Sequence, residues 1–88
     1  MKKIQWDLEK SLFIQNNPSR GVSLELIAEL IQNDAYIDII ARKKYPDQRA
    51  FVVPITDEVW CVPFREDDDI IYLITAWPDR KLRRKYHE

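Results

Sequence analysis

The sequence predicts an α+β fold, in which two N-terminal helices pack on one face of a twisted antiparallel sheet of four to five strands and a short helix closes the chain. Two observations predict this class. Apolar residues recur at helical spacing within the first 33 residues, and from residue 36 onward four apolar segments rich in β-branched and aromatic residues follow one another. The helices need a partner for their apolar stripes, and one sheet face provides it. With 88 residues, of which 45% are hydrophobic, the chain is expected to form a single domain over residues 1–88.

The N-terminal third contains a short strand and two helices. Residues 4–6 are a strand candidate, and Asp7 is a suitable N-cap for a helix over residues 8–15. Leu8 and Leu12, together with Phe13, supply the apolar side of this helix.

A break over residues 16–21 separates the two helices, and it contains the only glycine of the chain, Gly21. A glycine there is suited to the positive φ that a tight turn requires. Ser23 is then the expected N-cap of the second helix, which should end near Asn33. Its apolar stripe consists of Leu26, Ile27, Leu30 and Ile31.

The remainder of the chain predicts an antiparallel meander. The expected strands cover residues 36–40, 50–55, 59–64 and 70–77, with hairpin turns at 56–58 and 66–69. Pro54 and Pro63 have no N–H for a ladder, so each should lie at a strand edge, at a bulge or with its nitrogen facing outward. Cys61, the single cysteine, lies between Trp60 and Val62 and is expected to be a buried structural thiol in a reducing compartment.

The sequence lacks the motifs that are typical of most enzyme classes. The sequence has no Gly-rich phosphate loop, no metal-spaced His and Cys cluster and no serine-nucleophile motif, and its one histidine is His87. The acidic run 66–69 fits a solvated turn better than a divalent metal site, because adjacent carboxylates in a short turn splay outward. No cofactor and no metal are therefore expected. The N-terminus lacks the apolar stretch of a secretion signal and no window approaches a membrane span, which predicts a cytoplasmic protein without membrane association.

The end of the chain is strongly basic. Five of the fourteen Lys and Arg residues lie between Arg80 and Lys85, although the whole chain has a net charge of -1. Such a concentration favours an anion with closely spaced charges, and RNA is the obvious candidate. The alternative is a short terminal helix that buries Leu82 and Tyr86 and solvates its polar side. Both interpretations remain open on the residues alone.

Cationic side chains can support the cutting of RNA without a metal ion. A base removes the proton of the 2′-hydroxyl, and its oxygen attacks the neighbouring phosphorus. Guanidinium groups stabilise the added charge of the phosphorane, and an acid protonates the 5′-oxygen as its bond to phosphorus breaks. Lys81 is a candidate base among Arg80 and Arg84, and Tyr86 is a candidate proton donor. The further cations are Arg20, the run Arg42-Lys43-Lys44, Arg49 and Arg65.

Four segments in this order resemble BrnT-like toxins of the RelE-type toxin-antitoxin superfamily. They are Trp6-Asp7-Leu8-Glu9-Lys10, Arg20-Gly21-Val22-Ser23-Leu24-Glu25, Tyr45-Pro46-Asp47-Gln48-Arg49, and the last strand with Pro78-Asp79-Arg80-Lys81 and Tyr86. The resemblance implies a small α+β ribonuclease whose cutting inhibits translation. It also implies a partner, a DNA-binding antitoxin encoded in the neighbouring gene, through which the complex reaches promoter DNA.

The resemblance assigns roles by position and also shows two departures. The catalytic candidates are Arg49, Arg80, Lys81 and Tyr86, and the RNA-binding candidates are Arg20, Lys43, Lys44 and Arg84. Residues 41–44 lack the histidine that many relatives have there, and Trp77 stands where many close the strand with arginine. These departures leave open a second hypothesis, a binding module of the same fold that docks an antitoxin or another acidic partner without cutting RNA. A DNA-binding regulator is a weaker third hypothesis, because Glu25, Glu29 and Asp34 on the second helix repel phosphate.

Overall fold

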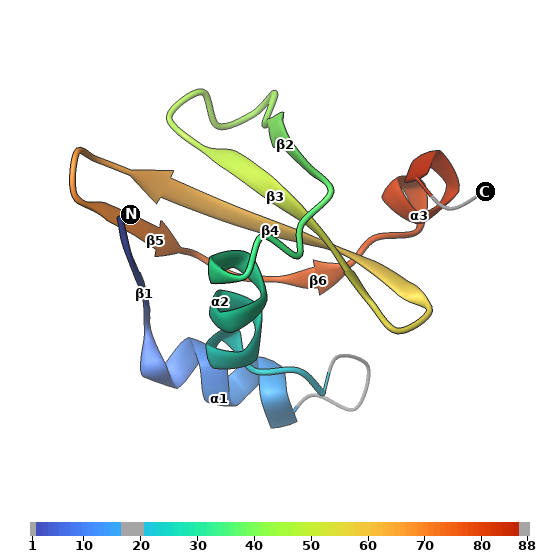
Figure 1. The fold of residues 1–88 in the computed structure, drawn as a ribbon, viewed down its shortest axis with the longest axis horizontal. Helices are drawn as coiled ribbons and strands as arrows, with labels where there is room; N and C mark the ends of the chain where they lie inside the picture. Colours follow the sequence, from blue (N-terminus) through green and yellow to red (C-terminus); the bar gives the residue numbers. More distant parts are fainter. Residues whose placement is uncertain (1, 17–20, 87–88) are drawn as a thin grey trace.

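A computed structural model describes residues 2–16 and 21–86. Its elements follow one another as β1 (Lys3–Trp6), α1 (Leu8–Asn16), α2 (Leu24–Gln32), β2 (Asp38–Ala41), β3 (Arg49–Ile55), β4 (Glu58–Glu66), β5 (Ile70–Leu73), β6 (Trp77–Pro78) and α3 (Arg80–Tyr86). The α+β class and the two N-terminal helices are confirmed, as is the short C-terminal helix (Figure 1).

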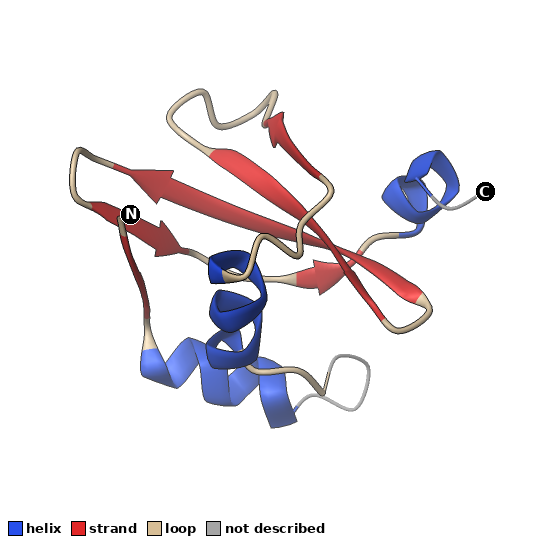
Figure 2. Ribbon diagram, in the orientation of Figure 1, coloured by secondary structure: helices blue, strands red, loops and turns tan. Residues whose placement is uncertain are grey.

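The sheet has the order β1-β5-β4-β3-β2, and β6 pairs with β4 beside this path. Strands β2 to β5 form the predicted antiparallel meander. The first strand differs from the expectation, because β1 pairs with β5 in parallel and the sheet is therefore mixed. Helices α1 and α2 intervene between β1 and β2, so β1 is free to join the far end of the sheet (Figure 2).

The last predicted strand is two strands. Residues 70–77 were expected to run without a break, but β5 ends at Leu73 and β6 begins at Trp77. The long strand β4 pairs with both of them, with β5 near its end and with β6 at Trp60 and Cys61.

Both strand prolines lie where no ladder donor is needed. Two residues, Thr56 and Asp57, close the β3–β4 hairpin, so Ile55 and Glu58 opposite each other form a hydrogen-bonded pair. Hydrogen-bonded and non-bonded pairs alternate along the ladder, so the nitrogens of Pro54 and Pro63 point away from the hairpin partner. Pro63 thereby faces the interruption between β5 and β6, where its carbonyl accepts the Ile74 N–H at 2.9 Å.

One face of the sheet, here called the front face, carries the core. It is the side covered by α1 and α2, which lie below the sheet in Figure 1. Its buried side chains from β3, β4 and β5 are Phe51, Val53, Trp60, Val62, Phe64 and Leu73, and α2 adds Leu24, Ile27, Ala28 and Ile31. The Phe51 and Phe64 rings stack with centroids 4.3 Å apart. Burial of this apolar surface is the main source of stability.

Helix α1 turns its predicted apolar side outward. Leu8, Leu12 and Phe13 are exposed, whereas Ser11 and Ile14 are buried. The reason lies at the beginning of α2, where the Ser11 hydroxyl oxygen accepts the buried Leu24 N–H at 3.0 Å. This contact directs the Ser11 and Ile14 side of α1 to α2, and Leu8 and Leu12 lie off that side.

The predicted helix caps are confirmed. Asp7 Oδ1 accepts the N–H groups of Glu9 and Lys10 at 2.9 and 3.3 Å. Ser23 Oγ accepts the Leu26 N–H at 3.1 Å. Gly21 has the expected positive φ of 63°. Each cap satisfies backbone donors that the first helical turn leaves without an internal partner.

Candidate functional site

The other face of the sheet, here called the back face, collects polar and charged groups over a small apolar floor. Directly opposite residues place their side chains on the same face, and the register aligns Asp38 with Val52, Val52 with Cys61, and Cys61 with Trp77. Ile40, Ala50 and Pro63 form the next row. The loop over residues 42–48 reaches this side through Arg42, which lies over the Trp77 ring, and helix α3 reaches it through the bond between Tyr86 and Asp38.

A hollow of about 220 Å³ lies between the loop and the back face. Its floor is formed by Ile40, Ala50 and Cys61, and its rim includes the run Arg42-Lys43-Lys44 and Tyr45. Two of the predicted RNA-binding residues, Lys43 and Lys44, are exposed at this rim. A solvent-open depression with cationic walls is suited to an anion with a partly apolar body.

Arg42 is the most constrained cation at the hollow. Its guanidinium carbon lies 4.4 Å from the Tyr45 ring centroid and 5.6 Å from the Trp77 ring centroid. Its Nη1 donates to Oε1 of the buried Gln48 at 2.6 Å. These contacts hold the guanidinium in one orientation before any ligand binds, and they lower the entropy that binding would cost.

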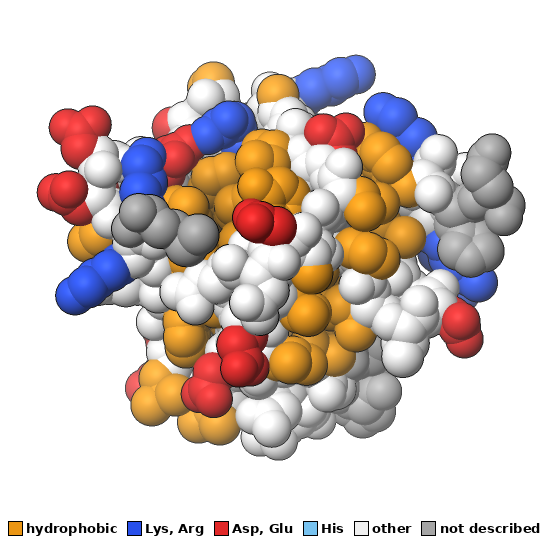
Figure 3. Space-filling view, in the orientation of Figure 1, with side chains coloured by type: hydrophobic (Ala, Val, Ile, Leu, Met, Phe, Trp, Pro, Cys, Tyr) orange, Lys and Arg blue, Asp and Glu red, His pale blue; other side chains and the backbone are white. Residues whose placement is uncertain are grey.

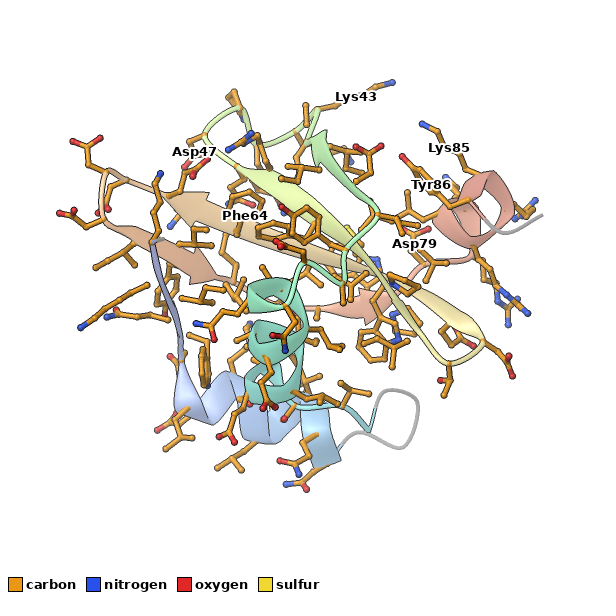
Figure 4. The ribbon with its side chains drawn as sticks, viewed as in Figure 1. Lys43, Asp47, Phe64, Asp79, Lys85 and Tyr86 are labelled. Carbon is orange, nitrogen blue, oxygen red and sulfur yellow. The ribbon has the colours of Figure 1, made fainter. Side chains whose placement is uncertain are left out.

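Helix α3 supplies the second group of cations. Asp79 begins it as an N-cap, because Asp79 Oδ1 accepts the N–H groups of Lys81 and Leu82 at 2.9 and 3.1 Å. Leu82 and Tyr86 are half-buried, whereas the five cations of the helix are exposed. Arg80, Lys81 and Arg84 are thus presented to solvent, and Lys81 is not enclosed by the protein. In Figure 4, Lys43 and Lys85 both project from the upper margin of the molecule, one from the loop and one from α3.

The catalytic candidate Tyr86 already has a partner. Its hydroxyl donates to Asp38 Oδ2 at 2.5 Å and so ties α3 to β2. This bond raises the pKa of the Tyr86 phenol above its ordinary value. The same bond, with a second from the Ile39 N–H, lowers the pKa of Asp38. Tyr86 acts here as an anchor, which is the alternative that its spacing from Leu82 allowed.

Arg49 is not brought together with the other candidates. It lies on the front face, where it forms an ion pair with Glu66 and its guanidinium carbon is 5.4 Å from the Phe64 ring centroid. Arg49 is opposite Phe64 on β4, whereas Val59 of β4 accepts the Asp79 N–H near α3. These two positions of β4 are about 16 Å apart at 3.3 Å per residue. Figure 4 shows Phe64 well separated from Tyr86. Arg20, the remaining candidate, lies outside the described residues.

Cys61 is not a nucleophile in this setting. It is buried, as predicted, and burial raises the pKa of its thiol to about 11, with a smaller contribution from Asp79 and opposition from Arg42. The thiol is therefore protonated at neutral pH and forms part of the floor.

The acidic run 66–69 has a structural role. Asp67 Oδ1 accepts the Asp69 and Ile70 N–H groups, which shapes the β4–β5 turn and lowers the pKa of Asp67. Glu66 binds Arg49 and Lys2. Among residues 2–16 and 21–86, no three His, Cys, Asp or Glu side chains are grouped to hold a metal ion.

Sequence reasoning did not select Arg42, Tyr45 and Trp77 as one group. The spacing of Arg42 and Tyr45 in a loop carried a weak signal, but Trp77 joins them only through the pairing of β6 with β4. Asp38 was likewise not expected as the partner of Tyr86.

Comparison with protein-family models, with curated proteins and with solved structures finds no match for this chain. In the described part of the chain, α1 and α2 are nine residues long, and no helix has the length and apolar character needed to cross a bilayer.

Proposed function

We propose that the chain is the toxin of a bacterial toxin-antitoxin pair and that it cuts RNA without a metal ion on its back face. The observation that supports this most is that two distant basic segments, Arg42-Lys43-Lys44 and α3, reach the same side of the sheet, through the contact of Arg42 with Trp77 and the bond of Tyr86 to Asp38. Three aspartates lie on that side: Asp38 is bonded to Tyr86, Asp79 caps α3, and Asp47 pairs with Arg65. Among the described residues, none of the three forms an ion pair with the cations of residues 42–44 or of α3. The cations are therefore left to attract phosphate.

We assign a separate role in the proposed reaction to each group of cations. Arg42, held in place by Gln48, Tyr45 and Trp77, is the proposed phosphodiester-binding group, and Lys43 and Lys44 add charge at the rim. Lys81 and Arg80 at the beginning of α3 are the groups left for proton transfer and charge stabilisation in the proposed cut. Tyr86 keeps α3 in place, since its hydroxyl is bonded to Asp38.

The test uses purified protein, single-stranded RNA and excess EDTA. We expect fragments with 2′,3′-cyclic phosphate ends, and we expect Lys81→Ala to slow the cut by about 10²-fold, the usual loss for a proton-transfer group. Arg42→Ala should weaken RNA binding, and this binding should fall steeply as salt is raised. Lys10→Ala, which removes an exposed cation of α1, is the matched control and should cut at the rate of the unchanged chain. Intact RNA at every protein concentration contradicts the nuclease proposal.

A second candidate function is a binding module that docks an antitoxin or another acidic partner and cuts nothing. The engagement of Tyr86 by Asp38 and of Arg49 by Glu66 favours it, because two of the four expected catalytic side chains have internal partners. Its signature is growth without toxicity when the chain is expressed alone, with a stable complex recovered when the neighbouring gene is co-expressed. Growth arrest relieved by Lys81→Ala speaks for the nuclease instead.

A further inference from the structure

The outer side of β1 is an open strand edge. Lys3 donates its N–H to the Asp69 carbonyl at 3.0 Å, so Lys3 and Gln5 direct their backbone groups to β5. Successive residues alternate, and the backbone groups of Ile4 and Trp6 therefore point away from the sheet. Among the described residues, no strand pairs with this side. A hollow of about 270 Å³ is lined by Ile4, Gln5 and Trp6 of this strand, and Figure 1 shows β1 at the margin of the molecule.

The order of charges along this edge is complementary to the same edge of a second copy running in the opposite direction. Lys3 and Gln5 alternate with the core-facing Ile4 and Trp6 and share one face, and Asp7, the next position in this alternation, follows the strand directly as the N-cap of α1, so the order is positive, neutral, negative. In an antiparallel pair of two copies centred on Gln5, Lys3 of each copy lies directly opposite Asp7 of the other. Such opposite-charge pairs stabilise a ladder.

In the same register, the outward backbone N–H and C=O groups of the two copies also meet. The outward groups of Ile4 and Trp6 form hydrogen-bonded pairs between the copies. A shift of two residues in either direction removes the Lys3–Asp7 pairing. Asp7 uses Oδ1 to cap α1, and no described residue forms an ion pair with its second oxygen.

An apolar surface continues from the edge onto α1. Leu8 begins the helix two residues after the strand and is 67% exposed, and Leu12, one turn further, is 49% exposed. A four-residue strand pair alone is smaller than the roughly 1,200 Å² that stable interfaces bury. In this register the Leu8 residues of the two copies lie on opposite sides of the two-fold axis, about 20 Å apart at 3.3 Å per residue, so each α1 surface adds apolar area only against the N-terminal end of the other copy's β1.

From these features we infer that a second copy of this chain binds at β1, so that two sheets join as one across a two-fold axis. The axis is perpendicular to the joined sheets, because both copies contribute the same strand edge in antiparallel pairing. The back faces of the two copies therefore lie on the same side of the dimer. If the proposed function holds, one RNA strand can lie across both basic surfaces.

The experiment is sedimentation velocity over a concentration series of the full chain, without RNA. We expect a monomer–dimer equilibrium, and we expect Lys3→Glu to raise the dimer dissociation constant about tenfold or more, because like charges then oppose each other at two places. Asp7→Asn keeps an N-cap side chain and should weaken the dimer less. Lys10→Glu makes the same charge change as Lys3→Glu on an exposed position of α1 outside the strand, and it should leave the equilibrium unchanged.

Mixing two variants sharpens the test. Lys3→Glu and Asp7→Lys each place like charges in their own dimer, but a mixed dimer restores opposite charges at both places. Dimer should therefore reappear on mixing, with circular dichroism to show that each variant is folded. A chain that remains monomeric up to about 1 mM, or a dimer equally stable in Lys3→Glu, overturns the inference. Neither result depends on RNA cutting, so failure here is distinct from failure of the nuclease proposal.

Discussion

The two faces of this sheet differ in what fills them. The front face is closed by α2 with large apolar side chains and an aromatic stack, and Figure 3 shows hydrophobic side chains gathered across the view from that side. The back face has a floor of small residues, Ala50 and Cys61, and is bordered by cations on a loop and a short helix. The front face therefore carries the stability, and the back face has the room and the charge to bind a ligand.

The largest difference is expected for core truncation. Phe64→Ala on the front face removes a fully buried ring stacked on Phe51 and should lower the free energy of unfolding by about 3–5 kcal/mol. Cys61→Ala on the back face removes one atom and should cost about 1 kcal/mol. Urea unfolding of both variants measures the contrast, and equal losses would contradict the division between faces.

A smaller loss is expected at the contact that positions α1. Ser11→Ala leaves the buried Leu24 N–H without an acceptor and should cost about 1–3 kcal/mol. Thermal unfolding followed by circular dichroism measures it. Ser11→Thr keeps the hydroxyl and is the comparison variant. A neutral Ser11→Ala would show that the contact does not orient the helix.

A gain is expected at the end of α2. Asp34 has a φ of 58°, and Ala35 donates to the Leu30 carbonyl at 2.8 Å, which is the arrangement of a Schellman cap. Asp34→Gly should stabilise the chain by up to about 1 kcal/mol, because glycine adopts this φ without steric cost. Asn33→Gly, at a φ of -92°, should give no gain. Chemical denaturation distinguishes the two.

The most local effect is expected for the bond between Tyr86 and Asp38. Tyr86→Phe should loosen α3 while the front-face core is unchanged, measured by amide exchange of α3 against β3.

The same bond should make the stability of the folded chain depend on pH. The pKa of Asp38 is lowered in the folded chain, so the contribution of Asp38 to stability is complete above the ordinary value of 3.8 and is lost as pH falls through the folded pKa. The pKa of Tyr86 is raised in the folded chain, so the contribution of Tyr86 to stability is complete below the ordinary pKa of 10.0 and is lost as pH rises through the folded pKa. Asp38→Asn should abolish the acid transition alone, as followed by NMR shifts of α3.

Local signals predicted the elements well. Asp7 and Ser23 cap their helices as expected, because a cap depends only on residues within one turn, and Asp79 caps α3 in the same way. The hairpin turns and the burial of Cys61 are also confirmed. The exposed side of α1 was not predictable from its apolar spacing, because the helix follows the contact between Ser11 and α2.

The cationic residues of the candidate site could be predicted from the sequence, but their arrangement in space could not. Cation clusters at residues 42–44 and 80–85 are visible in the sequence, yet whether they meet depends on which sheet face each follows. Arg49 shows the limit, since one residue of register decides whether a strand side chain lies on the back face or on the front. Its ion pair with Glu66 then engages the guanidinium on the front face.

The class of fold, the helix caps and the basic C-terminal end could be predicted, since these follow from composition, periodicity and contacts within a few residues. Four features became visible only in the folded chain: the parallel pairing of β1, the division of the last strand, the burial of Ser11 in place of Leu8, and the contacts of Arg42 with Tyr45 and Trp77. The physical reason is that these features depend on strand register and on packing between segments far apart in the chain, where many alternatives have similar local energy.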